Sequence, residues 1–196
     1  MAQFARPDGH HPSLGIGDWY DEGGGTTNIY QAIDEASATD GDYIEVAGDG
    51  SSDFPATFTL SNVTDPESSS GHKVVIRALG NNGGMGEGEG PDLRVDLLEG
   101  TTSRANWLIE HGTGTDELTD SAQTFDSNTL TPTQANSITD YTDLSLKITL
   151  QPGDASGGET LRVHQAYFEC PEAGGGGGGD SLQALSGLSA LSGLSV

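Results

Sequence analysis

Residues 92–97 read Asp-Leu-Arg-Val-Asp-Leu, a run in which charged and apolar side chains alternate at every position. Successive side chains of a β-strand point to opposite faces, so Leu93, Val95 and Leu97 share one face. A strand of this kind has one face on an apolar core and the other in water, which is typical of antiparallel sheets. The run therefore predicts a half-buried strand of an antiparallel sheet.

Further runs of strand character lie on both sides of this one, with turn-forming residues between them. Six glycines fall in the segment 80–90, and Asp40-Gly41 is a turn signal. The other predicted strands cover residues 42–46, 56–60, 73–79, 105–111, 144–150 and 161–170. About eight strands in about 150 residues predict an all-β fold, an antiparallel β-sandwich of jelly-roll type.

One or two short helices are predicted between the strands. The segment 26–34 spaces its apolar residues for one helix face, and Thr26 or Thr27 can cap it. Residues 131–134 read Thr-Pro-Thr-Gln, a capping box with proline at the first helical position. We expect the second helix to run through Ile138.

The chain has 196 residues, with 30 Asp and Glu against 7 Lys and Arg, so its formal net charge is −23. Nucleic acids and anionic membranes both attract basic surfaces, so this composition argues against both as partners. No apolar run is long enough to cross a membrane, and we expect no signal peptide. The acidity fits a saline or marine setting; the alternative is a solvated surface that keeps crowded copies apart.

Composition divides the chain into three parts. Residues 1–26 look irregular, and we expect Trp19 and Tyr20 to pin this N-terminal arm onto the rest. Residues 27–173 are predicted to form the β-sandwich domain. Residues 174–196 are predicted to form a glycine linker and a C-terminal anchor.

The extended C-terminal tail begins with six glycines, after which leucine recurs at every third position. An α-helix turns about 100° per residue and would spread these leucines around its surface, whereas a three-residue turn would align them. An exposed apolar ridge marks an interaction site, so we predict an anchor that docks on a partner or on symmetry-related copies. The alternative is a disordered or proteolysed tail. The predicted anchor residues are Leu182, Leu185, Leu188, Leu191, Leu194 and Val196.

The sequence contains no recognisable motif for catalysis, metal binding or cofactor binding. His10 and His11 are adjacent without a zinc motif, and residues 49–53 lack the spacing of a calcium-binding EF-hand loop. The glycine-rich segment 80–90 lacks the Gly-Lys-Ser/Thr end of a phosphate loop, and no Gly-x-Ser-x-Gly elbow occurs. We predict no catalytic residue, no metal and no cofactor. Cys170, the single cysteine, is interpreted as a small buried apolar side chain.

Several segments form a recognisable combination. They read Arg-Pro-Asp-Gly at 6–9, Asp-Trp at 18–19, Thr-Asn-Ile-Tyr-Gln-Ala-Ile-Asp-Glu at 27–35 and Asp-Gly-Asp-Tyr-Ile at 40–44, followed by 130–144 and 162–169. Together, over most of residues 5–173, they resemble a family of small structural proteins of tailed viruses of prokaryotes. The resemblance implies a β-sandwich module of the virion, such as a head decoration, spike or fibre-associated protein. The strong acidity and the leucine-rich tail depart from the family pattern, and the resemblance carries over no site or partner.

The first functional hypothesis is a non-enzymatic virion structural protein. It would be a capsid decoration or spike-type protein, attached through its C-terminal tail to the major capsid protein or to a neighbouring head or tail protein. We expect a homo-oligomer, and a trimer would suit both a threefold shell position and a three-residue repeat. The alternative is a tail- or fibre-associated module that binds carbohydrate or the host surface. A hydrolase is disfavoured by the missing motifs.

The carbohydrate-binding alternative makes its own prediction about aromatic residues. It needs a cluster of exposed aromatic side chains on one face or loop rim. The candidates are Trp19, Tyr20, Trp107, Tyr141 and Tyr167, although such residues more often pack in a core or at an edge.

Overall fold

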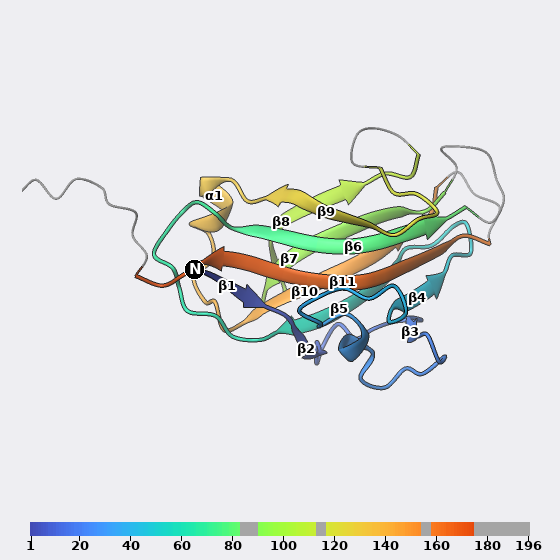
Figure 1. Ribbon diagram of the computed structural model, residues 1–196, viewed down its shortest axis with the longest axis horizontal. Helices are drawn as coiled ribbons and strands as arrows, with labels where there is room; N and C mark the ends of the chain where they lie inside the picture. The colour runs from blue at the N-terminus through green and yellow to red at the C-terminus, as the bar shows by residue number, and fades with distance from the viewer. Residues whose placement is uncertain (83–89, 113–116, 154–157, 175–196) are drawn as a thin grey trace, which may run out of the picture.

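The computed structural model describes residues 1–82, 90–112, 117–153 and 158–174, which form two antiparallel sheets packed face to face (Figure 1). Sheet A has the order β3-β4-β11-β6-β9, and β1 pairs with β11 beside that path. Its strands are β1 (Ala2–Ala5), β3 (Tyr20–Asp21), β4 (Ile44–Ala47), β6 (Lys73–Asn81), β9 (Gln123–Thr129) and β11 (Thr160–Pro171). Sheet B has the order β2-β5-β10-β7-β8. Its strands are β2 (Pro7–His10), β5 (Phe54–Leu60), β7 (Asp92–Glu99), β8 (Thr102–Ile109) and β10 (Leu144–Gln151).

Eight of these strands have the connectivity of a jelly roll. The strands β4, β11, β6 and β9 are neighbours in that order in sheet A, and β5, β10, β7 and β8 are neighbours in sheet B. Along the chain from β4 to β11, every connection crosses from one sheet to the other except the one between β7 and β8. Two interleaved Greek keys of this kind are a jelly roll, so the predicted fold class is confirmed.

The alternating run at residues 92–97 forms most of β7, an interior strand between β10 and β8. Leu93, Val95 and Leu97 are fully buried between the sheets, as the alternation predicts. The opposite face of the strand was predicted to lie in water but is less exposed to solvent than that, because Asp96 is only 3% exposed. Its carboxylate lies against the Arg94 guanidinium, which shields it from water.

The irregular N-terminal arm predicted for residues 1–26 is wrong, because this segment contributes strands to both sheets. β1 pairs with the last strand, β2 pairs with β5, and β3 extends the edge of sheet A. Trp19 does pin the segment: its side chain is fully buried, and its indole Nε1 donates to the Phe54 carbonyl at 3.0 Å. Because β2 contains Pro7 and Gly9, its sequence does not predict a strand. β2 is an edge strand with a register shift, a position where proline is tolerated.

The described residues include two short helical segments. The first is η1 (Ile29–Ala32), a 3₁₀ turn that begins at Asn28 in the left-handed region, without the threonine side-chain cap that the sequence predicted. The second is α1 (Pro132–Ala135), where both hydrogen bonds of the predicted capping box form. This helix ends three residues before Ile138, although backbone turns continue to that residue.

Strand β9 was missed by the sequence analysis. It reads Gln-Thr-Phe-Asp-Ser-Asn-Thr, with one large apolar side chain, Phe125, that is 3% exposed. Among the described strands β9 pairs with β6 alone and lies at the edge of sheet A. Most of its side chains need no burial, so its sequence shows no apolar alternation.

Cys170 is fully buried at the end of β11, and burial raises the pKa of its thiol to about 11. This confirms its interpretation as a packing residue. Within the described ranges, no helix is long and apolar enough to cross a membrane. The predicted anchor, from Leu182 to Val196, lies outside the described residues.

Candidate functional site

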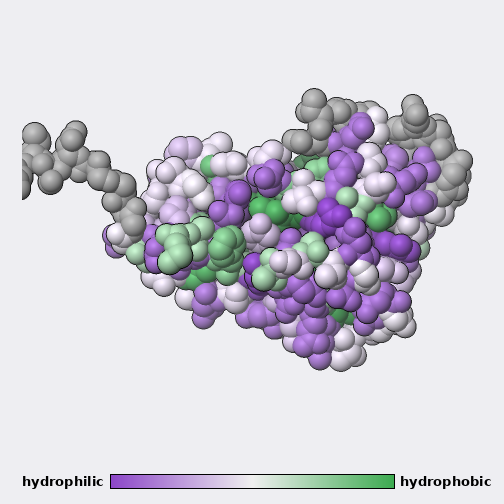
Figure 2. All heavy atoms as spheres, in the orientation of Figure 1, coloured by the Kyte–Doolittle hydropathy of each residue, from purple (hydrophilic) through white to green (hydrophobic). Residues whose placement is uncertain are grey.

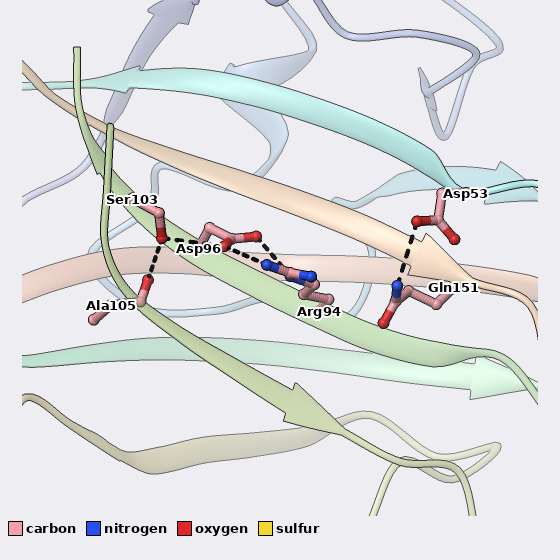
Figure 3. A network of polar contacts seen from close by, with 6 residues as sticks. All are labelled: Asp53, Arg94, Asp96, Ser103, Ala105 and Gln151. Atoms are coloured by element: carbon pink, nitrogen blue, oxygen red, sulfur yellow. Dashed lines mark hydrogen bonds and ion pairs between the residues drawn. The ribbon is translucent and has the colours of Figure 1, made fainter. Parts of the chain in front are cut away.

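The outer face of sheet B carries polar side chains, several of which are hydrogen-bonded to one another (Figure 3). Arg94 on β7 donates from Nε and Nη2 to the two carboxylate oxygens of Asp96, both at 3.0 Å. Ser103 on β8 donates to the same carboxylate at 3.3 Å, and Gln151 on β10 donates to Asp53 at 3.3 Å. The Asp96 carboxylate raises the pKa of the Arg94 guanidinium. The Ser103–Asp96 contact links β8 to β7, whereas Lys147, opposite Asp96 on β10, forms no ion pair with the described residues.

Most cations of the molecule are neutralised in this way. Of the 7 Lys and Arg residues, five form ion pairs: Lys73–Glu169, Arg77–Asp40, Arg94–Asp96, Arg104–Glu99 and Arg162–Glu45. Arg6 and Lys147 form no ion pair with any residue that the structure describes. Arg6 lies between β1 and β2, over the Tyr167 ring of sheet A, whereas Lys147 lies on β10 of sheet B. The described surface therefore offers no cluster of free cations for a polyanion.

The histidines are individual packing residues. His72 lies within hydrogen-bond distance of the buried Tyr141 hydroxyl at 2.8 Å, and His111 contacts the Gly80 carbonyl at 3.1 Å. His164 is 2% exposed, and neither ring nitrogen has a hydrogen-bond partner among the described residues. Burial lowers the pKa of both His72 and His164. No group of three His, Cys, Asp or Glu side chains in the described ranges is arranged to hold a metal.

The two weak metal candidates of the sequence have other roles. Backbone amides of Ser51 and Ser52 donate to the Asp49 carboxylate, which lowers the pKa of Asp49 and closes a turn. His10 lies edge-on to two aromatic rings, and His11 accepts from two backbone amides through Nδ1. The histidine pair is thus part of the folded body, rather than of the irregular arm predicted for residues 1–26.

Glu159, just before β11, is an unusual buried carboxylate. Its side chain is fully buried, and neither carboxylate oxygen has a hydrogen bond of good geometry within the described residues. Burial raises the pKa of Glu159, while the Gly153 backbone offsets part of the effect. The nearby carboxylates of Asp92 and Asp49 raise it further.

A hollow of about 270 Å³ lies beside η1. Its carboxylates come from Asp21, Glu22, Glu35 and Asp42, and burial raises the pKa of Glu35. Asp21 is already engaged, because its Oδ1 accepts from two glycine amides. Its other polar lining residues are Thr27, Asn28 and Gln31, and no Lys or His among the described residues lines it.

The aromatic residues that could have lined a sugar-binding face lie mostly inside the protein. Trp19 is fully buried, Tyr141 is 5% exposed, and Trp107 packs against the core from β8. Trp19 and Tyr141 are therefore not available for an exposed sugar-binding rim. The most exposed aromatic residue that the structure describes is Phe4, which is 47% exposed on β1.

Phe4 belongs to a small cluster on the outer face of sheet A, which we name the terminal patch: Phe4, Arg6, Val75 and Tyr167. The Phe4 and Tyr167 rings meet edge to face with centroids 5.7 Å apart. The Arg6 guanidinium lies 5.0 Å from the Tyr167 ring centre and 5.7 Å from that of Phe4. Val75 lies opposite Tyr167 in the β6–β11 pairing but is only 2% exposed, so the exposed surface of the patch comes mainly from Phe4. Periodic apolar runs in the sequence do not reveal this patch, because its residues come from segments that are distant in the chain.

The described chain ends close to this patch. Ala2 of β1 pairs with Pro171 of β11, and the Met1 amino group forms an ion pair with Glu172 at 2.7 Å. The amide of Gln3 donates to the Pro171 carbonyl at 2.8 Å, which ties the two segments together. Figure 2 shows apolar side chains gathered over β1 at this end of the sandwich. The C-terminal tail therefore starts next to the N-terminal strand.

Comparison with known proteins gives no family for this chain. No family model matches it, and no curated protein matches it. Among solved structures, the CBM36-1 domain of a multidomain xylanase from the hindgut metagenome of Trinervitermes trinervoides aligns at 12% sequence identity and a TM-score of 0.39. The alignment covers 89% of this chain and 99% of that domain.

Proposed function

We propose that this chain is a non-enzymatic virion structural protein, a capsid decoration or spike-type protein attached to the particle by its C-terminal tail. The proposal rests on the resemblance of residues 5–173 to small structural proteins of tailed viruses, and on a body with a filled core. The partner would be the major capsid protein or a neighbouring head or tail protein, and the location the virion. Neither nucleic acid nor a membrane is expected as a partner.

The observation that carries the proposal is the single point from which the tail leaves. β11 ends at Pro171 beside β1, so a tail attached at Gly174 holds the jelly roll by one end. The long axis of the sandwich can then stand away from the surface that the tail grips (Figure 1). Such a body is suited to display and leaves both sheet faces uncovered.

Attachment would depend on burial of the tail's apolar side chains. Each leucine contributes about 1.5–3 kcal/mol when fully buried. The ordering of a glycine-linked segment opposes this, at roughly 1–2 kcal/mol per residue for the backbone. Several copies joined as a homo-oligomer, for example a trimer, would add avidity and offset that cost. The formal charge of −23 on each chain would keep neighbouring particles apart.

The test is to bind purified particles with the full chain and with a chain that lacks residues 174–196, and to count bound copies per particle. We expect the truncated chain to lose attachment. A second variant keeps the tail length but replaces the five tail leucines with serine, and its control replaces Ser186, Ser189 and Ser192 with alanine. Full occupancy by the leucine variant would overturn the proposal.

The structure also shows which control is unsuitable. Deletion of residues 1–20 would test the N-terminal segment as a rival anchor, but it removes β1, β2 and the buried Trp19. A chain without these elements would lose attachment by unfolding. The exposed Phe4→Ser variant tests the same end of the body without removing a strand.

A further inference from the structure

We propose that two copies of this chain pair edge to edge through β8, so that sheet B of one copy continues antiparallel into sheet B of the other. The pairing covers residues 105–109 of each copy and is centred on Trp107. It concerns the chain itself and does not depend on the identity of any particle. The expected homo-oligomer would then be a dimer, rather than the trimer given above as an example.

The free side of β8 can be located from the residues that follow the strand. β8 pairs with β7 on one side, and no other described strand pairs with it. The His111 amide, just beyond the strand, donates to the Asp92 side chain of β7 at 3.0 Å. The backbone groups of a strand alternate in direction, so the preceding carbonyl, that of Glu110, lies on the side away from β7. There it accepts from the Leu118 amide at 2.9 Å, which marks the end of the free edge.

By the same alternation, Asn106 and Leu108 direct their backbone N–H and C=O groups away from β7. Residues 105–109 pair with β7 without a register shift, so the alternation is unbroken over this stretch. Apart from the β7–β8 pairing, no backbone hydrogen bond joins Asn106 or Leu108 to another described residue. Unpaired groups in a row along a sheet edge are a template for a further strand.

The other sheet edges in the described part of the chain are protected. β1, β2 and β3 have at most four residues each, and β2 contains Pro7. β9 carries Asp126 and has a register shift in its pairing with β6. Short strands, proline, bulges and charges all hinder pairing at an edge. By contrast, β8 has eight residues without proline or a carboxylate, its own register shift precedes residue 105, and its one cation, Arg104, is paired with Glu99.

The charge of the molecule favours this stretch for contact with a second copy. Each chain has a formal net charge of −23, so copies repel one another wherever carboxylates meet. Residues 105–109 read Ala-Asn-Trp-Leu-Ile and bring no charge to the contact. Two copies of one strand can pair about a two-fold axis, which occupies the open edge of each and closes the assembly as a dimer.

The unpaired backbone groups also select the register. With the axis at Trp107, Asn106 lies opposite Leu108 of the second copy, and the outward N–H and C=O groups of both residues are all paired. An axis at Asn106 or at Leu108 would pair only one of the two residues within this stretch. A slip by one residue would place inward-facing side chains opposite outward-facing ones.

The side chains on both faces gain from this pairing. Trp107 packs against the core but is only partly buried, and it would lie opposite Trp107 of the second copy, with Cα atoms about 4.5 Å apart. Leu108 is 51% exposed on the outer face and would lie against the second strand. Burial of both apolar surfaces favours association. Five residues a side are fewer than the roughly 20–30 of a stable interface, so the dimer is weak and its fraction depends on concentration.

The experiment is sedimentation equilibrium of the full chain over a range of concentrations, at low salt and at about 1 M salt. We expect the mass to rise with concentration from 20.2 kDa toward twice that value. High salt should increase the dimer fraction, because it screens the repulsion between acidic bodies. A mass that stays at one chain under all conditions, or that rises to three chains, would overturn the proposal.

Variants test the edge itself. Leu108→Asp places like charges at the contact and should leave the chain monomeric. Asn106→Pro removes an outward N–H, which an edge strand tolerates, and should do the same. The control is Thr129→Asp, which adds the same charge to the exposed side of the β9 edge and should leave the dimer fraction unchanged. Dimerisation of Leu108→Asp equal to that of the wild type would overturn the proposal.

Disulfide cross-linking tests the register. Cys170 is fully buried, so the cysteine introduced by Asn106→Cys or by Leu108→Cys is the one that reacts. The proposed register places residue 106 opposite residue 108 of the second copy, at a Cα distance of about 5.5 Å that a disulfide can bridge. Two copies of residue 106 would be diagonal neighbours about 7–8 Å apart. A mixture of the two variants should therefore cross-link under oxidation far more than either variant alone. Equal cross-linking in all three samples, or none in the mixture, would overturn the pairing about Trp107.

Discussion

The substitution Glu159→Gln should stabilise this protein at neutral and alkaline pH. Glu159 is fully buried before β11, and neither carboxylate oxygen has a hydrogen bond of good geometry within the described residues. Burial raises its pKa above the ordinary value of 4.5. The carboxylic acid is therefore tolerated in the fold, whereas the carboxylate is penalised.

The pH dependence follows from the direction of that shift. A carboxyl whose folded-state pKa is raised binds its proton more tightly in the folded state than in the unfolded state. Its favourable contribution is complete below about pH 4.5 and is lost as the pH rises through the folded-state pKa. Glutamine has the shape of the protonated acid without its titration. The gain from Glu159→Gln should be near zero at pH 4 and largest at pH 8.

The magnitude can be set from the cost of an unsatisfied buried group. Such a group costs about 1–3 kcal/mol, and more when it is charged. Glutamine keeps a polar amide in the same place, so we expect the lower part of that range to be recovered. For a chain of this size each kcal/mol shifts the melting temperature by about 2–4 °C.

The assay is urea unfolding of wild type and Glu159→Gln at pH 4 and pH 8. Its control is Glu22→Gln, which removes one charge at an exposed site and measures the general effect of lowering the net charge. The reasoning is refuted if the two variants gain equally at pH 8, or if Glu159→Gln gains more at pH 4 than at pH 8.

Three further predictions follow from buried groups and from the helix cap. Burial lowers the pKa of His164 below 6.5, so the free energy of unfolding should fall as the pH drops through 6.5. His164→Phe should reduce that loss when unfolding is measured at pH 7.5 and at pH 5. An unchanged pH dependence in the variant would contradict this. Thr131→Ala removes the cap hydrogen bond to Gln134 and should cost about 1 kcal/mol of unfolding free energy, whereas a loss below a few tenths would show that the cap is not needed. Cys170 should react with a thiol reagent only after urea unfolds the chain, and rapid labelling of the native protein would contradict its burial.

The jelly-roll class could be predicted because its interior strands carry a recognisable alternation of apolar and polar residues in the sequence. β7 and β10 alternate apolar and polar residues, since each is packed on one face and hydrogen-bonded on both sides. Edge strands carry a weaker signal. β9 buries one large side chain and β2 contains proline and glycine, so neither resembles a strand in the sequence.

The candidate site could be predicted only in part. A tail with leucine at every third residue is visible in the sequence, and its role as an anchor remains a prediction. The terminal patch was not visible, because Phe4 and Tyr167 are 163 positions apart and become neighbours only through the β1–β11 pairing.

The sequence by itself determined the class of fold, the charge of the surface and the existence of an apolar tail, because periodicity and composition are local or additive properties. The tertiary structure alone decided which residues face each other across the sheets. It buried Trp19 and Glu159, paired five of the seven cations with carboxylates, and placed the end of β11 beside Met1 and Ala2. These outcomes depend on the pairing of strands that are distant in the chain, which no local pattern encodes.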